Sequence, residues 1–251
     1  MTVRNPDREA IAHGRITNET IRTKPGVPTW ALKLIMAVTG LFFALFVVGH
    51  MAGNLKIYLP DHDGAPAIDH YGEYLRALGD PLIPEGHALW IVRIVLLACV
   101  LAHIYGAFTL ISRSRASRGK FRRTNLMGGL DSFATSTMLV TGVILLLFII
   151  FHILDLTMGV QPVASEAFVH GAVKANMIAT FSRWPVTIFY VLAMCALFLH
   201  LTHGIRLAAS DLGITGAKWR QVFLILAYIV PAVVCLANIV MPLSIALGWV
   251  S

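Results

Sequence analysis

The hydrophobic residues of this chain gather into five long runs, which cover roughly residues 30–55, 88–112, 133–159, 182–208 and 220–247. A helix needs about 20 apolar residues to cross the hydrocarbon core of a bilayer, and each run exceeds that length. Polar connections rich in turn residues separate the runs, such as PDHDGAP at 60–66. The pattern predicts an all-α bundle of five transmembrane helices over residues 30–251, preceded by a polar tail at 1–29.

The composition agrees with a membrane protein. Hydrophobic residues make up 57% of the 251-residue chain and charged residues only 13%, about half of the charged fraction of a soluble domain. The three cysteines lie in the apolar runs, which argues against a disulfide framework of the kind that secreted domains use. The formal net charge of +7 first suggests nucleic acid, but its distribution indicates membrane topology instead. We therefore expect lipid as a partner and no nucleic acid.

Lysine and arginine are unevenly divided between the connections. The connection after the second run reads RSRASRGKFRR at 113–123, whereas the connection after the first run, 56–87, carries mainly acidic residues. Because short cytoplasmic loops are enriched in Lys and Arg, the chain is predicted to have its N-terminus in the cytoplasm and its C-terminus outside. We expect a multi-pass protein of the inner cell membrane.

Five of the ten histidines fall in the apolar runs, and four of them sort into two layers. His50 and His152 lie near the outer ends of two outgoing helices, whereas His103 and His200 lie toward the inner ends of two ingoing helices. Ionisable residues at membrane depth are rare and usually face the bundle interior, where they are functional. Bis-histidine ligation of haem needs two imidazoles from facing helices at matching depth. Two stacked pairs therefore predict redox cofactors on a path for electrons across the membrane.

Four segments, taken in order, resemble those of a known family. They are GLFFALFVVGHMAGNLKIYL at 40–59, VRIVLLACVLAHIYGAFTLISRSRASR at 92–118, GVILLLFIIFHILDL at 142–156 and HLTHGIRLAASDLG at 200–213. The chain resembles the single-chain, five-helix cytochrome b membrane anchor of succinate dehydrogenases and fumarate reductases. The resemblance covers essentially the whole chain from about residue 30.

The resemblance implies the membrane subunit of a succinate:quinone oxidoreductase, the respiratory complex II that also serves the tricarboxylic acid cycle. In such a complex a flavoprotein subunit oxidises succinate with FAD, and an iron–sulfur subunit with further Fe–S clusters relays electrons to the anchor. The anchor reduces a membrane quinone, here expected to be menaquinone. One or two bis-histidine haem b groups are implied, with His50 and His152 as outer ligands and His103 and His200 as inner ligands. Whether the complex forms a higher oligomer is left open.

Two cysteines leave a second cofactor open at the inner layer. Cys99 precedes His103 by four residues and Cys195 precedes His200 by five, at nearly the same depth. Two thiolates and two imidazoles are the ligand set of a Rieske-type [2Fe–2S] cluster, so haem and a membrane-embedded cluster both remain candidates. A helical step of five residues rotates Cys195 by about 140° from His200, which counts against joint ligation.

Candidates for the quinone site lie at both ends of the bundle. A quinone takes up two protons with two electrons, so a proton donor and groups that bind the ring are both expected. The proposed proton donors are His203 on the inner side and Glu73 on the outer side, where related anchors use an acidic residue. The proposed binding residues are Trp30, Arg206 and Asp211 on the inner side and Tyr71 on the outer side.

Asp155 follows His152 by almost one helical turn. It is predicted either to hydrogen-bond a ligand histidine, as carboxylates around metal sites often do, or simply to mark the membrane surface.

Two other functions remain as alternatives. A proton-coupled transporter would use the histidines as a relay and often carries inverted repeats, which we do not find in the sequence. A cytochrome b anchor of another respiratory enzyme, such as a hydrogenase or formate dehydrogenase, would also use paired histidines. The contexts GHMAGN at 49–54 and HIYGAFTL at 103–110 favour the succinate dehydrogenase anchor.

Overall fold

The computed structural model of the chain describes residues 26–118 and 130–250. Most of the polar tail and the end of the basic connection lie outside these ranges. Within the described part, five helices are long and apolar enough to cross a membrane, which confirms the all-α, five-span prediction. They are α2 (Thr29–Asn54), α4 (His87–Arg118), α5 (Leu130–His152), α7 (Trp184–Asp211) and α8 (Ala217–Ala246).

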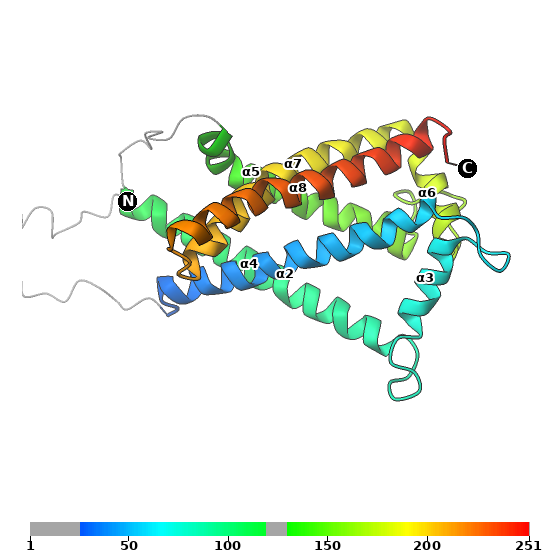
Figure 1. The fold of residues 1–251 in the computed structure, drawn as a ribbon, viewed down its shortest axis with the longest axis horizontal. Coiled ribbons are helices and arrows are strands. Elements are labelled where there is room, and N and C mark those ends of the chain that lie inside the picture. Colours follow the sequence, from blue (N-terminus) through cyan, green and yellow to red (C-terminus); the bar gives the residue numbers. More distant parts are fainter. Residues whose placement is uncertain (1–25, 119–129, 251) are drawn as a thin grey trace, which may run out of the picture.

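Successive long helices run in opposite directions along one bundle. The start of α2, the end of α4, the start of α5, the end of α7 and the start of α8 all lie at one end, which we call the inner end after the predicted topology (Figure 1). The opposite, outer end carries two short helices, α3 (Ala67–Arg76) and α6 (Val173–Phe181). Residues at equal depth on different long helices are therefore brought to the same level.

Helix α7 is the centre of the bundle, because it packs against α2, α5 and α8. Its buried face includes Ala193, Ala196, Ala208 and Ala209, and such small side chains let neighbouring helix backbones approach closely. Helix α4 packs mainly against α2, from which it diverges toward the outer end (Figure 1). The exposed side chains of the long helices are mainly large and apolar, as a surface in contact with lipid tails requires.

The outer end of α5 departs from regular helix. The chain continues from His152 into a single π-helical turn, η2 (Ile153–Met158), which Gly159 ends in the left-handed conformation at φ 67°. A π-turn inserts extra residues into the helical path and is frequent at functional sites. Here it carries Asp155 to a position with 0% exposure.

Candidate functional site

One pair of histidines, with ring planes tilted by 55°, lies between α4 and α7 at the inner half of the bundle. The ring centres of His103 and His200 are 6.4 Å apart. Each ring also meets a threonine of a further helix. Thr39 Oγ1 on α2 lies 2.9 Å from His103 Nδ1, and Thr141 Oγ1 on α5 lies 3.2 Å from His200 Nδ1. Four helices thus converge on this pair.

The two threonines decide which ring nitrogen carries the hydrogen. Thr39 donates its hydroxyl to the Ile35 carbonyl oxygen at 2.6 Å, and Thr141 donates to the Thr137 carbonyl oxygen at 3.0 Å. A hydroxyl has one hydrogen to give, so a threonine that bonds its backbone carbonyl accepts from the imidazole. In that arrangement both rings carry their hydrogen on Nδ1, which leaves the Nε2 lone pair free for a metal.

Glycines let the helix backbone approach the same two rings. Gly40 and Gly142 directly follow the threonines. A Cβ atom built on Gly40 would lie 3.5 Å from His103 Cε1, and one built on Gly142 would lie 3.5 Å from His200 Cε1. A methyl group would already be in van der Waals contact with the ring, so any larger side chain would occupy space beside the histidines.

This arrangement comes from a repeat in the sequence that we did not identify from the sequence alone. Val-Thr-Gly occurs at 38–40 and again at 140–142, and a histidine follows the glycine by ten residues in both cases. Thus α2 and α5 each supply a threonine to one inner histidine and carry one outer histidine themselves. The equal spacing is the signal that points to Thr39 and Thr141.

The second pair, His50 and His152, lies at the outer ends of α2 and α5. The ring centres are 5.7 Å apart and the ring planes are nearly perpendicular, at 84°. Each ring stacks on the phenylalanine four residues before it, His50 on Phe46 and His152 on Phe148. The repeat between α2 and α5 therefore extends to the aromatic contact of the outer histidines.

A buried ion pair adjoins His152. Arg183 Nη2 donates to Asp155 Oδ1 at 2.7 Å, and Tyr190 donates its hydroxyl to Asp155 Oδ2 at 3.3 Å. The same tyrosine oxygen lies 3.3 Å from His152 Nδ1. Asp155 is fully buried rather than a marker of the membrane surface, and it reaches His152 through Tyr190. No sequence signal pointed to Arg183 or Tyr190.

The two histidine pairs fit bis-histidine ligation of haem. Imidazoles bonded through nitrogen at about 2 Å to opposite sides of one metal have ring centres about 6 Å apart, close to the observed 6.4 Å and 5.7 Å. Among the described residues, no group of three or more His, Cys, Asp or Glu side chains is placed to hold a metal ion. Haem suits such a pair, because the porphyrin supplies the remaining ligands.

The cysteines of the cluster hypothesis do not gather around the inner histidines. Cys195 is exposed on α7 and has Cys235 of α8 as its neighbour, while Cys99 is partly exposed on α4. In the described part of the chain these thiols and the two imidazoles form no common metal site.

The inner quinone candidates are spread over the inner end. Lys33 Nζ forms a salt bridge with Asp211 Oδ1 at 3.1 Å, and Trp30 is 69% exposed. His203 lies near enough to His200 to interact with it electrostatically, and Arg206 lies one turn further along α7.

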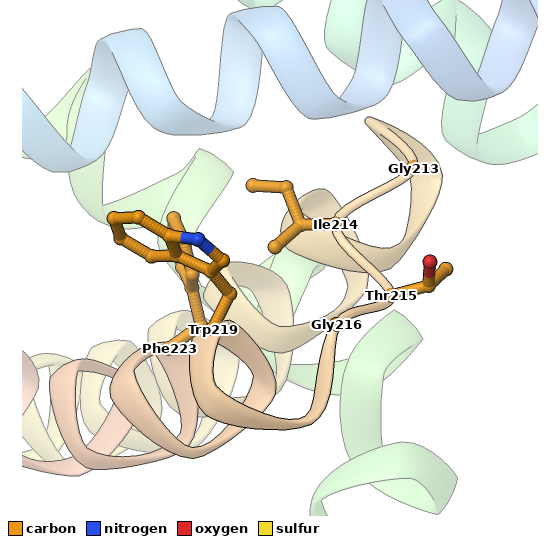
Figure 2. Close-up of a pocket in the computed structure, with 6 residues that line it drawn as sticks. All are labelled: Gly213, Ile214, Thr215, Gly216, Trp219 and Phe223. Atoms are coloured by element: carbon orange, nitrogen blue, oxygen red, sulfur yellow. The ribbon is translucent and has the colours of Figure 1, made fainter.

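A pocket of about 460 Å³ opens at the turn between α7 and α8, lined by Gly213, Ile214, Thr215, Gly216, Trp219 and Phe223 (Figure 2). None of the four predicted residues lines it.

The two outer quinone candidates, Tyr71 and Glu73, have different surroundings. Tyr71 packs on α2, because a Cβ atom on Gly53 would lie only 2.6 Å from Tyr71 Cε1, and Lys56 Nζ lies 5.2 Å from the tyrosine ring centre. Glu73 is exposed and pairs with His70 at 3.6 Å. The structure therefore places Tyr71 in a packed contact and Glu73 at the surface of the outer end.

Comparison with known proteins gives one match. Residues 114–240, about half of the chain, match the family model described as the succinate dehydrogenase/fumarate reductase transmembrane subunit. The matched stretch contains His152 and His200 but neither His50 nor His103. The comparison with curated proteins and the comparison with solved structures each found no match.

Proposed function

The chain belongs to the family of succinate dehydrogenase and fumarate reductase transmembrane subunits, and from that premise we propose that it passes electrons from an iron–sulfur subunit to a membrane quinone. It is a multi-pass membrane protein of such a complex. We propose succinate oxidation as the working direction and menaquinone as the acceptor. The flavoprotein with FAD and the iron–sulfur subunit with its clusters are the proposed partners.

One observation carries the proposal, namely two facing histidine pairs placed one behind the other along the bundle. Gly40 lies beside the His103 ring, and His50 follows it by ten residues, so the pairs are separated by about 15 Å along the helix axis. We assign one haem b to His103 and His200 and a second to His50 and His152. Haem supplies an iron that accepts and releases one electron at a time.

The protein's own part is to hold each imidazole in the form that can ligate. Thr39 and Thr141 accept from Nδ1 of the inner histidines, which points the free Nε2 lone pairs away from the supporting helices. The exposed faces of the helices around both layers carry mainly large apolar side chains, which suits a path for electrons that is shielded from solvent by lipid. The quinone receives them at one end of the bundle.

Mutations at the two ends of the bundle distinguish an inner from an outer quinone site. His203 with Trp30, Arg206 and Asp211 represents the inner site, and Glu73 with Tyr71 represents the outer site. We propose that the iron–sulfur subunit binds at the inner, cytoplasmic end. We therefore propose the outer quinone site, because the two haem layers lead from that end toward it. Glu73→Gln is then expected to lower quinone reduction, whereas His203→Gln is expected to change it much less. The reverse result would place the site at the inner end.

Replacing His103 or His200 by Ala tests the electron path. Each variant is expected to abolish succinate:quinone activity of the purified complex while succinate oxidation with an artificial dye acceptor continues on the partner subunits. His87→Ala is the matched control, because His87 is an exposed histidine that bonds only to nearby carbonyl oxygens in the described structure. Quinone reduction that survived in His103→Ala would contradict the inner-layer assignment.

The family match also weighs against the two alternatives. A transporter that relays protons would need its histidines in a file, whereas here they form two separate pairs. An anchor of a hydrogenase or formate dehydrogenase would share the paired histidines, but the matched family model describes succinate dehydrogenase and fumarate reductase.

A further inference from the structure

The outer histidine His152 differs from the inner histidines in the group that supports its ring. His103 and His200 face threonine hydroxyls that donate to neutral backbone carbonyls. His152 faces Tyr190, whose hydroxyl donates to the Asp155 carboxyl group. A neutral support at the inner layer is thus replaced at the outer layer by a tyrosine coupled to a charge.

The hydrogen bonds of this cluster run in one direction when Asp155 is ionised. Asp155 receives donors from Arg183, Thr180 and Tyr190, and the Arg183 guanidinium at 2.7 Å stabilises the ionised carboxylate. With Asp155 ionised, Tyr190 donates its hydrogen to Asp155. The tyrosine oxygen then accepts from His152, which places the hydrogen on Nδ1 and leaves Nε2 free.

The cluster is rigidly built. The π-helical turn η2 places Asp155 at 0% exposure, and Arg183 is held from the other side by the Val163 carbonyl oxygen at 2.8 Å. Tyr190 is itself 5% exposed and enclosed by Phe148 and Phe181 at ring-centre distances of 5.0 Å and 4.9 Å. Arg183 offsets the charge of Asp155 at longer range, so the carboxylate acts on its neighbours mainly through its direct hydrogen bonds, which are strong where little water screens them.

From this arrangement we infer that Tyr190 and Asp155 are positioning residues for His152, which make its imidazole a stronger electron donor and lower the redox potential of the outer centre. The inference rests on the proposed haem ligation by His50 and His152. A ligand imidazole whose N–H is hydrogen-bonded toward a carboxylate becomes more basic. A more basic ligand favours the oxidised, more positive iron, and such hydrogen bonding is one of the means by which proteins set redox potential.

Redox titration of the purified complex tests the inference, with each component followed by its haem absorption bands and by its paramagnetic resonance spectrum. The outer component is the one that His152→Ala removes. Tyr190→Phe removes the hydroxyl between ligand and carboxylate, and Asp155→Asn removes the charge. Both are expected to shift the outer midpoint potential upward and to alter its resonance spectrum, while the inner component stays unchanged.

Tyr105→Phe is the matched control, because Tyr105 is a lipid-facing tyrosine of α4 with 55% exposure. An outer component that is the same in Tyr190→Phe and Asp155→Asn as in Tyr105→Phe would overturn the inference. If the Asp155→Asn variant does not assemble into the complex, the Tyr190→Phe variant alone tests the inference. A wild-type complex without any b-type haem would instead overturn the proposed cofactor, and this inference with it.

Discussion

Thr39 and Thr141 illustrate how much a single side chain contributes to this site. Serine and threonine in helices often donate their hydroxyl back to a carbonyl of the preceding turn, which usually has no function. Here that bond leaves the oxygen lone pairs to accept from His103 and His200, which favours the Nδ1–H tautomer of each histidine. The histidines could be found from their depth in the sequence. The threonines are marked there only by the repeated Val-Thr-Gly spacing, and their role depends on which helices face each other.

Thr39→Val and Thr141→Val keep the shape of the residue and remove the hydroxyl. We expect each variant to lower haem occupancy or quinone activity by about tenfold, the lower part of the range for residues that support metal ligands. Thr39→Ser and Thr141→Ser retain the hydroxyl and are expected to behave as wild type. The haem-to-protein ratio of the purified complex measures the effect, and full occupancy in the valine variants would show that the hydroxyls are dispensable.

At the scale of helices, close backbone contacts and one irregular turn hold the elements in register. Such features leave weak traces in a sequence, since a glycine or an aspartate within an apolar run does not reveal what lies opposite. The π-turn of η2 was not foreseen, because hydrophobic runs alone do not distinguish a π-turn from a regular helix end. The hydrophobic pattern predicts only polar connections where the short helices α3 and α6 lie.

Gly53 tests the contact between α2 and α3. A Cβ atom there would meet Tyr71 Cε1 at 2.6 Å, whereas one on Gly49 of the same helix meets nothing within 4 Å. Gly53→Ala is therefore expected to destabilise the protein by about 1–3 kcal/mol, the usual cost of overpacking, and Gly49→Ala to have little effect. Thermal inactivation of the two variants side by side gives the comparison, and equal inactivation temperatures would contradict the contact.

The ion pair between η2 and Arg183, the residue before α7, makes a second prediction at this scale. Asp155→Ala leaves Arg183 without its charged partner, and breaking such a buried pair costs about 3 kcal/mol or more. Arg183 has a side-chain exposure of 31%, so the lower part of that range applies. The double variant Asp155→Ala with Arg183→Met leaves no unpaired charge and is expected to be more stable than Asp155→Ala alone. Reversible unfolding in mixed detergent measures both, and an equally unstable double variant would show that the charge pair is unimportant.

At the scale of the whole molecule, the sequence predicted the architecture well. Each of the five apolar runs corresponds to a helix long enough to span a membrane, because a bilayer admits few other solutions for such a run. The structure adds the pairing of helices, in which α2 and α5 are equivalent members of a repeat and each serves both histidine layers. The inside location of the N-terminus stays a prediction from the distribution of Lys and Arg.

The central claim is that two histidine pairs hold two haem b groups within one chain. A reduced-minus-oxidised visible spectrum of the purified complex, with haem quantified against protein, tests it most directly. We expect sharp b-type bands and two haems per chain, with one lost in His103→Ala and the other lost in His152→Ala. A spectrum without haem bands, together with a low-temperature paramagnetic signal of Rieske character, would contradict it.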